Sequence, residues 1–280
     1  MIETILIDGL EYPFNNEKED LIDGHVYCKV CGEQLDTEPI KLFGERHIFT
    51  KKCLCERKKT EAFERQQRLL QVESLKKDCF KSPKQHSHRF ENYRGDKTNA
   101  YVTALNYAKQ FSEMKEDNVG LIFFGPVGSG KTFLASCIAN YLMEKEMISV
   151  KMRNFSEIIN ELQTGGFNLD RNKYIDSFTN APLLILDDLG IERDTAYAKE
   201  QVYNVINSRY LKQKPTIITT NLPWQHILNT NDNMEYQRIY SRIVEMCIPV
   251  QVRAEDYRKR INENKLAKYR ERLSRRGDER

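Results

Sequence analysis

The chain has 280 residues, 40% of them hydrophobic and 30% charged, and it carries no tract rich in proline or glycine. This composition is typical of a globular protein, and the length allows one full-sized domain and a small one. No apolar run of about 18 residues is present, which excludes a membrane-spanning helix. The first residues, Met1 to Thr4, lack the basic and then apolar order of a secretory signal. We therefore expect a cytoplasmic protein with no membrane partner.

The net charge of +3 is small but unevenly distributed along the chain. Lysine and arginine outnumber the acidic residues about two to one in residues 51–84 and again in residues 253–280. Segments of this kind attract phosphate backbones, and they also occur as solvated faces of helices. The sequence alone leaves both interpretations open.

Four of the seven cysteines fall in one short N-terminal stretch, as Cys28-x-x-Cys31 and Cys53-x-Cys55. Two close pairs of thiolates suit a structural zinc ion, which stabilises a domain too small to fold on its own core. The second pair is C-x-C rather than C-x-x-C, so two alternatives stay open. In one, His47 replaces a thiol of the second pair; in the other, the thiols are free. The first domain predicted is residues 1–57.

A helix is expected next, because residues 56–75 contain no glycine or proline and are rich in Glu, Lys, Arg and Gln. A linker around Ser82–His88 follows it. We assign residues 58–89 to a helical linker and residues 90–280 to the main domain.

The main domain alternates short apolar runs with helical periodicity, the pattern of a parallel α/β sheet. Helices are expected at Thr132–Glu144 and Ala196–Lys212. Five strands are expected, at Val119–Phe124, Ile148–Met152, Leu183–Asp187, Thr216–Thr220 and Cys247–Val252.

A phosphate-binding loop lies between the first of these strands and the helix after it. Residues 125–132 fit the pattern G-x-x-x-x-G-K-[ST] at every fixed position. Its backbone N–H groups would surround the phosphates of ATP, Lys131 would reach the β- and γ-phosphates, and the Thr132 hydroxyl would hold Mg²⁺. The residues expected to contact the nucleotide are Gly125, Pro126, Val127, Gly128, Ser129, Gly130, Lys131, Thr132 and Phe133.

Polar side chains follow two further strands. The run Leu183–Leu186 ends in Asp187 and Asp188, and the run Thr216–Thr220 ends in Asn221. Ligands of open α/β sheets bind at these strand ends. Asp187 suits the Mg²⁺ shell through water, and Asp188 suits a general base that orients the attacking water. Asn221 would lie beside the γ-phosphate, although a polar residue there also suits a turn or a helix cap.

These elements, in this order, resemble an AAA+ ATPase, in particular the DnaC/DnaI helicase-loader branch and the related IstB transposition ATPase. The resemblance covers about residues 90–261. It rests on the phosphate-binding loop and on four further segments: Leu184–Gly190, Ile218–Leu222, Arg238–Ile243 and Glu255–Arg258. It implies an AAA+ P-loop NTPase with a five-stranded parallel sheet, preceded here by a small zinc-binding N-terminal domain.

The resemblance also implies roles for arginines. Arg242 corresponds to the arginine finger, Arg258 to the sensor-2 residue, and Arg238 to a neighbouring interface residue. A finger supplied in trans implies self-assembly through the ATP site. From the residues alone, Arg238 and Arg242 equally suit a basic face of a surface helix. Most AAA+ proteins have Glu where this chain has Asp188, which indicates slow hydrolysis.

Members of this family carry a helical insertion that lines a channel for single-stranded DNA, and residues 155–178 correspond to it. Four side chains in or beside it are basic or aromatic and suit stacking of unpaired bases, although the aromatic ones equally suit a core: Arg153, Phe167, Lys173 and Tyr174.

The function implied by the resemblance is an ATP-dependent loader that places a DnaB-type hexameric replicative helicase on single-stranded DNA. Its zinc-bearing domain would dock the helicase, by analogy with DnaI-type loaders. Two alternatives remain, an IstB-like ATPase that regulates transposition and a nucleotide-sensing adaptor that hydrolyses little ATP. The cofactors expected are ATP, Mg²⁺ and Zn²⁺.

Overall fold

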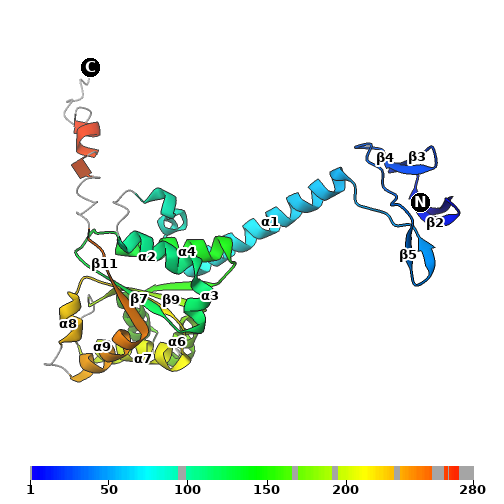
Figure 1. Ribbon diagram of the computed structural model, residues 1–280. Helices are drawn as coiled ribbons and strands as arrows, with labels where there is room; N and C mark the ends of the chain where they lie inside the picture. The colour runs from blue at the N-terminus through cyan, green and yellow to red at the C-terminus, as the bar shows by residue number, and fades with distance from the viewer. Residues whose placement is uncertain are drawn as a thin grey trace, which may run out of the picture. The chain divides into compact units, whose positions relative to one another are not determined.

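The computed structural model describes residues 2–93, 99–165, 170–190, 195–229, 234–253, 262–263 and 265–270 (Figure 1). The chain divides into two compact units, Met1–Gln71 and Val72–Arg280. The dividing point falls inside helix α1 (Leu54–Cys79), so this one helix contributes residues to both units. Among the described residues, no helix has the length and hydrophobicity needed to cross a membrane.

Three antiparallel hairpins build the first unit. Each has a two-residue turn in which both residues have positive φ, as at Asp8 (49°) and Gly9 (77°). These angles define type I′ turns, whose twist matches that of the flanking strands. The strands are β1 (Ile2–Ile7), β2 (Leu10–Asn15), β3 (Glu19–Ile22), β4 (His25–Cys28), β5 (Ile40–Leu42) and β6 (Glu45–His47).

The apolar core of this unit is small. Its buried members are Ile7, Tyr12, Val26, Cys28, Leu35, Ile48 and Cys53. The buried Asp36 carboxylate connects its own segment to β4, because it accepts hydrogen bonds from the Val26 backbone N–H at 2.7 Å and from the Gln34 side-chain amide at 3.0 Å. So few buried side chains indicate that the unit needs a further source of stability.

The end of α1 belongs to the second unit. Lys76 is buried, and its Nζ lies 2.7 Å from Glu144 Oε1. Asn140 donates hydrogen bonds to the carbonyl oxygens of Gln85 and His88, at 2.8 and 2.9 Å. Two 3₁₀ turns, Pro83–Ser87 and Phe90–Asn92, continue this segment. Residues 72–92 are therefore packed against the helix that carries Asn140 and Glu144, which is α4 (Lys131–Lys145).

A five-stranded parallel sheet forms the centre of the second unit, in the order β11-β7-β10-β9-β8. The prediction of such a sheet is confirmed, and every predicted strand exists within two residues of its expected ends. The strands are β7 (Gly120–Phe124), β8 (Val150–Asn154), β9 (Leu183–Leu189), β10 (Thr216–Thr220) and β11 (Cys247–Gln251).

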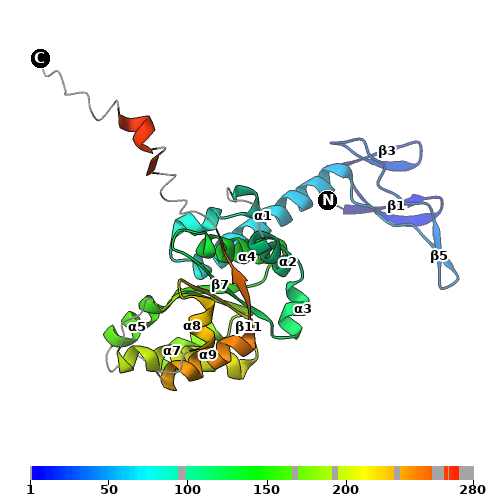
Figure 2. The same ribbon diagram turned by 60° about the vertical axis from the view of Figure 1, so that its left-hand side comes forward.

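Helices cover both faces of this sheet and bury a separate apolar cluster on each (Figures 1 and 2). α2 (Asn99–Lys109) and α4 lie on one face, next to the short α3 (Phe111–Glu116). The other face is covered by α5 (Phe155–Thr164), α6 (Arg171–Thr179), α7 (Ala196–Lys212), α8 (Trp224–Leu228) and α9 (Met234–Met246).

Arg209 of α7 stabilises the edge of the sheet at which the parallel strands begin. The side chain is fully buried, and burial lowers the pKa of its guanidinium to about 10. It donates to the carbonyl oxygens of Thr179 and Ala181 at 2.7 and 2.8 Å, to that of Pro215, and to Thr216 Oγ1 at 3.0 Å. These bonds join the segments that precede β9 and β10 to α7.

We expect Arg209→Met to lower the free energy of unfolding of the second unit by about 3 kcal/mol or more, because it leaves several buried oxygens without donors. The chain's single tryptophan, Trp224, lies in this unit, so urea unfolding followed by its fluorescence measures the change. Lys109→Met, at an exposed position of α2, is the control. Equal stabilities of the two variants would contradict the role of Arg209.

Candidate nucleotide and zinc sites

The phosphate-binding loop joins the end of β7 to the start of α4 and depends on two glycines in unusual conformations. Gly125 has φ +147°, and a Cβ there would lie 2.4 Å from the Val252 carbonyl oxygen. Gly130 has φ +99° and directly precedes the first residue of α4. The loop therefore presents backbone N–H groups and a helix N-terminus at the carboxyl edge of the sheet, the arrangement that binds phosphate.

Lys131 connects this loop to the end of β10. Its Nζ donates to the carbonyl oxygens of Gly125 and Pro126 at 2.9 and 2.8 Å, and to Asn221 Oδ1 at 2.8 Å. The structure thus brings together Lys131 and Asn221, which lie 90 residues apart in the chain. The ammonium group lies within the loop, where the phosphate oxygens of ATP can replace these acceptors.

Thr132 and Asp187 also meet, because Thr132 Oγ1 donates to Asp187 Oδ1 at 2.9 Å. Burial raises the pKa of the Asp187 carboxyl group, since a charged carboxylate is poorly solvated there. A divalent cation at this point would favour the ionised carboxylate. The two oxygens predicted to serve Mg²⁺ therefore lie side by side, next to the phosphate-binding loop.

A β-bulge in β9 sets the positions of both acidic residues. In the pairing with β10, Leu186 faces Ile218 and Leu189 faces Thr220, so Asp187 and Asp188 share the single position opposite Thr219. Asp188 has φ +61°, a left-handed conformation that is uncommon outside glycine. The bulge turns two successive carboxylates toward the edge where the phosphate-binding loop lies.

Thr219 holds this bulge in place with one hydroxyl group. Its Oγ1 donates to Asp187 Oδ1 at 2.6 Å and accepts a hydrogen bond from the Asp188 backbone N–H at 3.0 Å. The sequence pattern assigns no role to Thr219, which lies within the segment Ile218–Leu222. The available sequence signal was its position near the carboxyl end of β10, two residues before Asn221.

A second polar residue without a predicted role is Asn154, the last residue of β8. Its Nδ2 donates to Asp188 Oδ2 at 3.3 Å, and its Oδ1 accepts from the Ser156 backbone N–H at 2.9 Å, which caps α5. Asp188 is therefore held from two neighbouring strands. A cavity of about 290 Å³ opens beside these groups, and its lining includes Lys81, Lys84, Arg153, Asn154 and Asp187.

The predicted arginines differ in their surroundings. Arg238 is exposed on α9, and Arg242 lies half-buried one turn later on the same helix. Arg258, the predicted sensor-2 residue, lies outside the described residues, as does the rest of Glu255–Arg258.

The residues predicted to contact single-stranded DNA differ in their surroundings. Tyr174 packs edge-on against Phe178 at 5.4 Å between ring centroids and donates a hydrogen bond to Glu161 at 2.5 Å. Arg153 donates to the carbonyl oxygens of Cys79 and Met152. Lys173 is exposed, and Phe167 lies outside the described residues. The structure thus gives Tyr174 a packing contact, the alternative considered for the aromatic residues.

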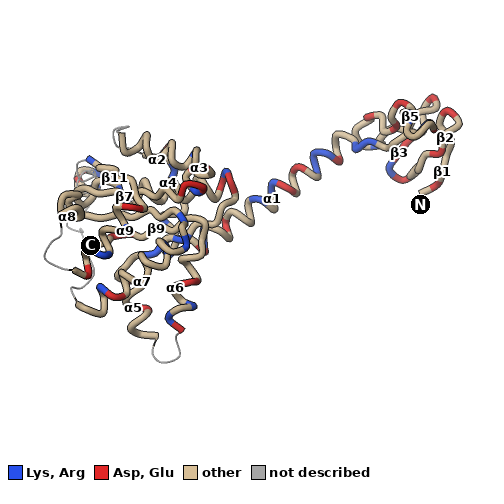
Figure 3. The backbone as a smooth tube through the Cα atoms, turned by 60° about the horizontal axis from the view of Figure 1, so that its bottom comes forward, with Lys and Arg blue, Asp and Glu red and all other residues tan. Residues whose placement is uncertain are grey.

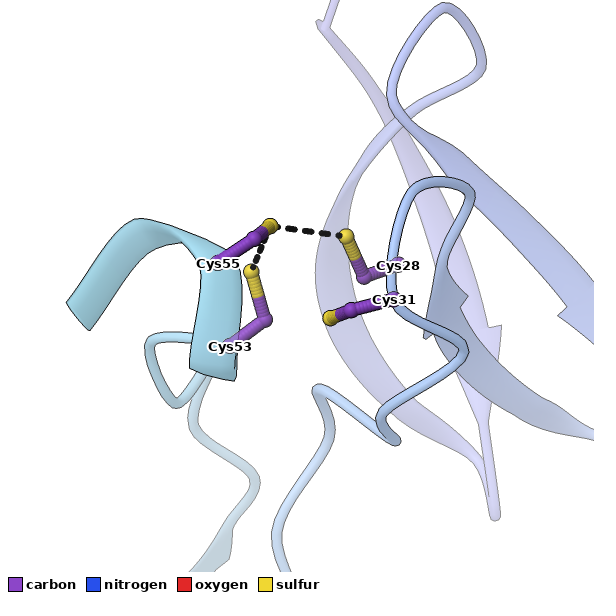
Figure 4. Close-up of side chains that lie close together, drawn as sticks. All are labelled: Cys28, Cys31, Cys53 and Cys55. Atoms are coloured by element: carbon purple, nitrogen blue, oxygen red, sulfur yellow. Dashed lines mark hydrogen bonds between the residues drawn. The ribbon is translucent and has the colours of Figure 1, made fainter. Parts of the chain in front are cut away.

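The four N-terminal cysteines lie close together (Figure 4). Cys28 and Cys31 come from the end of β4 and the turn after it, whereas Cys53 directly precedes α1 and Cys55 lies in its first turn. Their sulfur atoms all lie within 4.8 Å of one another, with Cys28 to Cys55 at 3.6 Å and Cys53 to Cys55 at 3.0 Å. Tetrahedral zinc with Zn–S bonds of about 2.3 Å separates its sulfurs by roughly 3.8 Å. The donor set therefore fits zinc. Among the described residues, His47 is not part of this group.

The parallel sheet, the phosphate-binding loop and the acidic strand end together define a P-loop NTPase of the AAA+ type. The chain belongs to the family of IstB-like ATP-binding proteins, which it matches over residues 51–265.

Several relatives are helicase loaders by name. The chain is 26% identical to the "Replicative helicase loader DnaC" of Escherichia coli (strain K12), over 57% of this chain and 66% of that protein. It is 26% identical to the "Replicative helicase loader DnaI" of Bacillus subtilis (strain 168), over 55% of this chain and 51% of that protein. The chain thus spans about half to two thirds of the length of these curated relatives. A third relative, YqaM of the same Bacillus strain, is 28% identical over 80% of this chain and 68% of its own length.

Solved structures show the same architecture. The crystal structure of the DnaC helicase loader aligns with a TM-score of 0.53 and 26% identity, over 61% of this chain and all of that chain. The DnaI crystal structure aligns with a TM-score of 0.54 and 23% identity, over 62% of this chain and 96% of that chain.

We expect Thr219→Val to lower the rate of ATP turnover by about 10- to 100-fold while ATP binding is kept, because the carboxylates lose the hydroxyl group that positions them. Single-turnover hydrolysis and nucleotide titration measure the two effects. Thr220→Val is the matched control, since among the described residues the Thr220 hydroxyl bonds backbone groups alone, at Leu189 and Leu222. Equal turnover by the two variants would contradict this role of Thr219.

For the cysteine cluster, we expect about one zinc per purified chain by elemental analysis, lost in the double variant Cys28→Ser/Cys31→Ser and kept in His47→Ala. Removal of the metal with a chelator should unfold the first unit, because metal binding supplies folding free energy there. Circular dichroism would record this loss, while the fluorescence of Trp224 stays unchanged. Zinc loss in His47→Ala would instead make that histidine a ligand.

Proposed function

We propose that this chain is an ATP-dependent loader that binds a DnaB-type hexameric replicative helicase and places it on single-stranded DNA. The observation that carries the proposal is the similarity to the DnaC helicase loader, whose whole crystallised chain aligns with this one at 26% identity. The similarity to DnaI supports the same assignment. The four-cysteine unit adds a second, separately folded surface for a protein partner.

In the proposed reaction, the phosphate-binding loop and Lys131 hold the triphosphate, and Asn221 orients its terminal phosphate. Mg²⁺ held by Thr132, and by Asp187 through water, would neutralise charge on the β- and γ-phosphates. Asp188 accepts a proton from the attacking water as the water oxygen bonds the γ-phosphorus and the bond to ADP breaks. Its carboxylate is one methylene shorter than the usual Glu, which is consistent with slow hydrolysis.

The reaction is completed only in an assembly. Arg242 of a second copy would stabilise the negative charge on the transferred phosphoryl group, an effect of about 10³- to 10⁵-fold on rate. ATP binding then favours association of the ATPase units, and hydrolysis releases them. This cycle suits a loader that must hold the helicase and afterwards leave it. The sensor-2 role of Arg258 remains part of the proposal.

The first unit is proposed to dock the helicase. It exposes several large apolar side chains, including Phe43, Val30, Ile2 and Leu6, as protein-binding surfaces do. α1 carries basic and acidic residues interspersed along its length (Figure 3). This mixture describes a solvated helix rather than a continuous basic stripe for DNA.

A second candidate function is regulation of transposition, which the family description favours because it is named for IstB. Such a protein would bind duplex DNA and a transposase. A nucleotide-sensing adaptor with little hydrolysis is the third candidate, and Asp188 in place of Glu is the feature that supports it.

Co-purification with the DnaB-type helicase of the same host, in the presence of ATP, tests the proposal. We expect the intact chain and His47→Ala to bind the hexamer, and Cys28→Ser/Cys31→Ser to lose binding because the docking unit unfolds. ATP-dependent loading on circular single-stranded DNA, measured as helicase unwinding, should be lost in Lys131→Ala. An intact chain that ignores the helicase but binds duplex DNA and a transposase would establish the IstB-like function instead.

A further inference from the structure

Arg242 lies between two tyrosine rings of α7. Its Cζ is 4.6 Å from the centroid of the Tyr203 ring and 5.4 Å from that of the Tyr210 ring. The two tyrosines are seven residues apart, so they lie on the same face of α7, two turns from each other. Both rings are half-buried against the apolar cluster beneath the sheet. The guanidinium group is thus held by rigid side chains of a neighbouring helix.

This contact holds Arg242 without an ion pair. In the part of the chain that the structure describes, no carboxylate lies within ion-pair distance of it, and its buried Nη1 has no hydrogen-bond partner. Aromatic faces attract a cation without using its N–H donors. The contrast with Arg209 is direct, since the buried guanidinium of Arg209 donates to several backbone oxygens.

The carboxylate best placed by sequence to neutralise Arg242 is engaged elsewhere. Glu245 follows Arg242 by three residues on α9, a spacing at which opposite charges usually pair. The hydroxyl of Tyr210 instead donates to Glu245 Oε1 at 3.1 Å. Tyr210 therefore does two things: its ring supports the guanidinium, and its hydroxyl holds the competing carboxylate.

We propose that Tyr203 and Tyr210 are positioning residues for Arg242, which hold its guanidinium ready for the γ-phosphate of ATP bound to a second copy of this chain. This inference rests on the proposed function, in which Arg242 acts in trans. An arginine free to sample its rotamers would have to be ordered at each encounter, and the tyrosine rings order it beforehand. Arg238, exposed one turn earlier, has no ring contact among the described residues.

A mixed-subunit assay tests this role in the full-length chain. Lys131→Ala supplies a finger but cannot hold ATP phosphates, whereas Arg242→Ala has an intact ATP site and no finger. Mixing the two in the presence of single-stranded DNA and the helicase should restore turnover that neither variant has alone. Tyr203→Leu is then introduced either into the finger donor or into the ATP-site subunit.

We expect Tyr203→Leu in the finger donor to lower the restored kcat by about 10- to 100-fold. In the ATP-site subunit the same change should leave kcat intact, and this placement also shows that the variant folds. Tyr203→Phe, which keeps the ring, should behave as the wild type in both positions. Equal losses in the two positions, or no loss in either, would overturn the positioning role.

Tyr210 provides an independent measurement. Tyr210→Phe in the finger donor keeps the ring but frees Glu245 to pair with Arg242, so the restored kcat should fall. Adding Glu245→Gln should recover it, a rescue that a purely structural role of the hydroxyl does not predict. Absence of that rescue would contradict the role assigned to the Tyr210 hydroxyl.

The outcomes for the two proposals are separable. If mixing Lys131→Ala with Arg242→Ala restores no turnover, Arg242 does not act in trans and both the finger assignment and this inference are wrong. If mixing restores turnover but the chain does not bind the helicase, the loader function is wrong and the role of the tyrosines stands.

Discussion

The hydroxyl group of Thr219 is the contact on which the acidic end of β9 depends. It occupies the single position opposite two carboxylates, donates to Asp187 and accepts from the backbone of Asp188. Without it the Asp188 backbone N–H and the buried Asp187 carboxylate would each lose a hydrogen-bond partner, at a cost of about 1–3 kcal/mol each. The irregularity in β9 is thus stabilised locally, and it places two successive carboxylates, Asp187 and Asp188, beside different partners, Thr132 and Asn154.

Hydrogen bonds between strand ends extend this arrangement across the sheet. Lys131 reaches Asn221 at the end of β10, and Asp188 is held by Asn154 at the end of β8. Each contact joins residues far apart in sequence, and together they make the loop and three strand ends one connected polar network. Hydrogen bonds in such a network polarise one another, so a change in the Lys131 contacts would also affect Asn221 at the end of β10.

Sequence patterns were sufficient to predict the features that depend on residues close together in the chain. Apolar runs identified the five strands, and the glycine spacing identified the phosphate-binding loop. Thr219 and Asn154 could not be recognised in this way, because a polar residue in a strand has the same sequence signature whichever group it contacts. Their roles follow from the register of β9 against its neighbours and from one bulge. The ring contacts of Arg242 likewise require the packing of α9 on α7, which no local pattern encodes.

The close approach of Gly125 to Val252 bears on the order in which parts of the chain can fold. Strand β11 pairs in parallel with β7, and Cys247 faces Gly120 across a long stretch of sequence. The backbone of Val252 then donates to the Phe124 carbonyl oxygen at 2.8 Å and closes one side of the phosphate-binding loop. Parallel pairing of such distant segments is slow compared with hairpin formation. The hairpins of the first unit pair residues that are close in sequence, whereas the Gly125 side of the phosphate-binding loop is complete only after the segment through Val252 has been made.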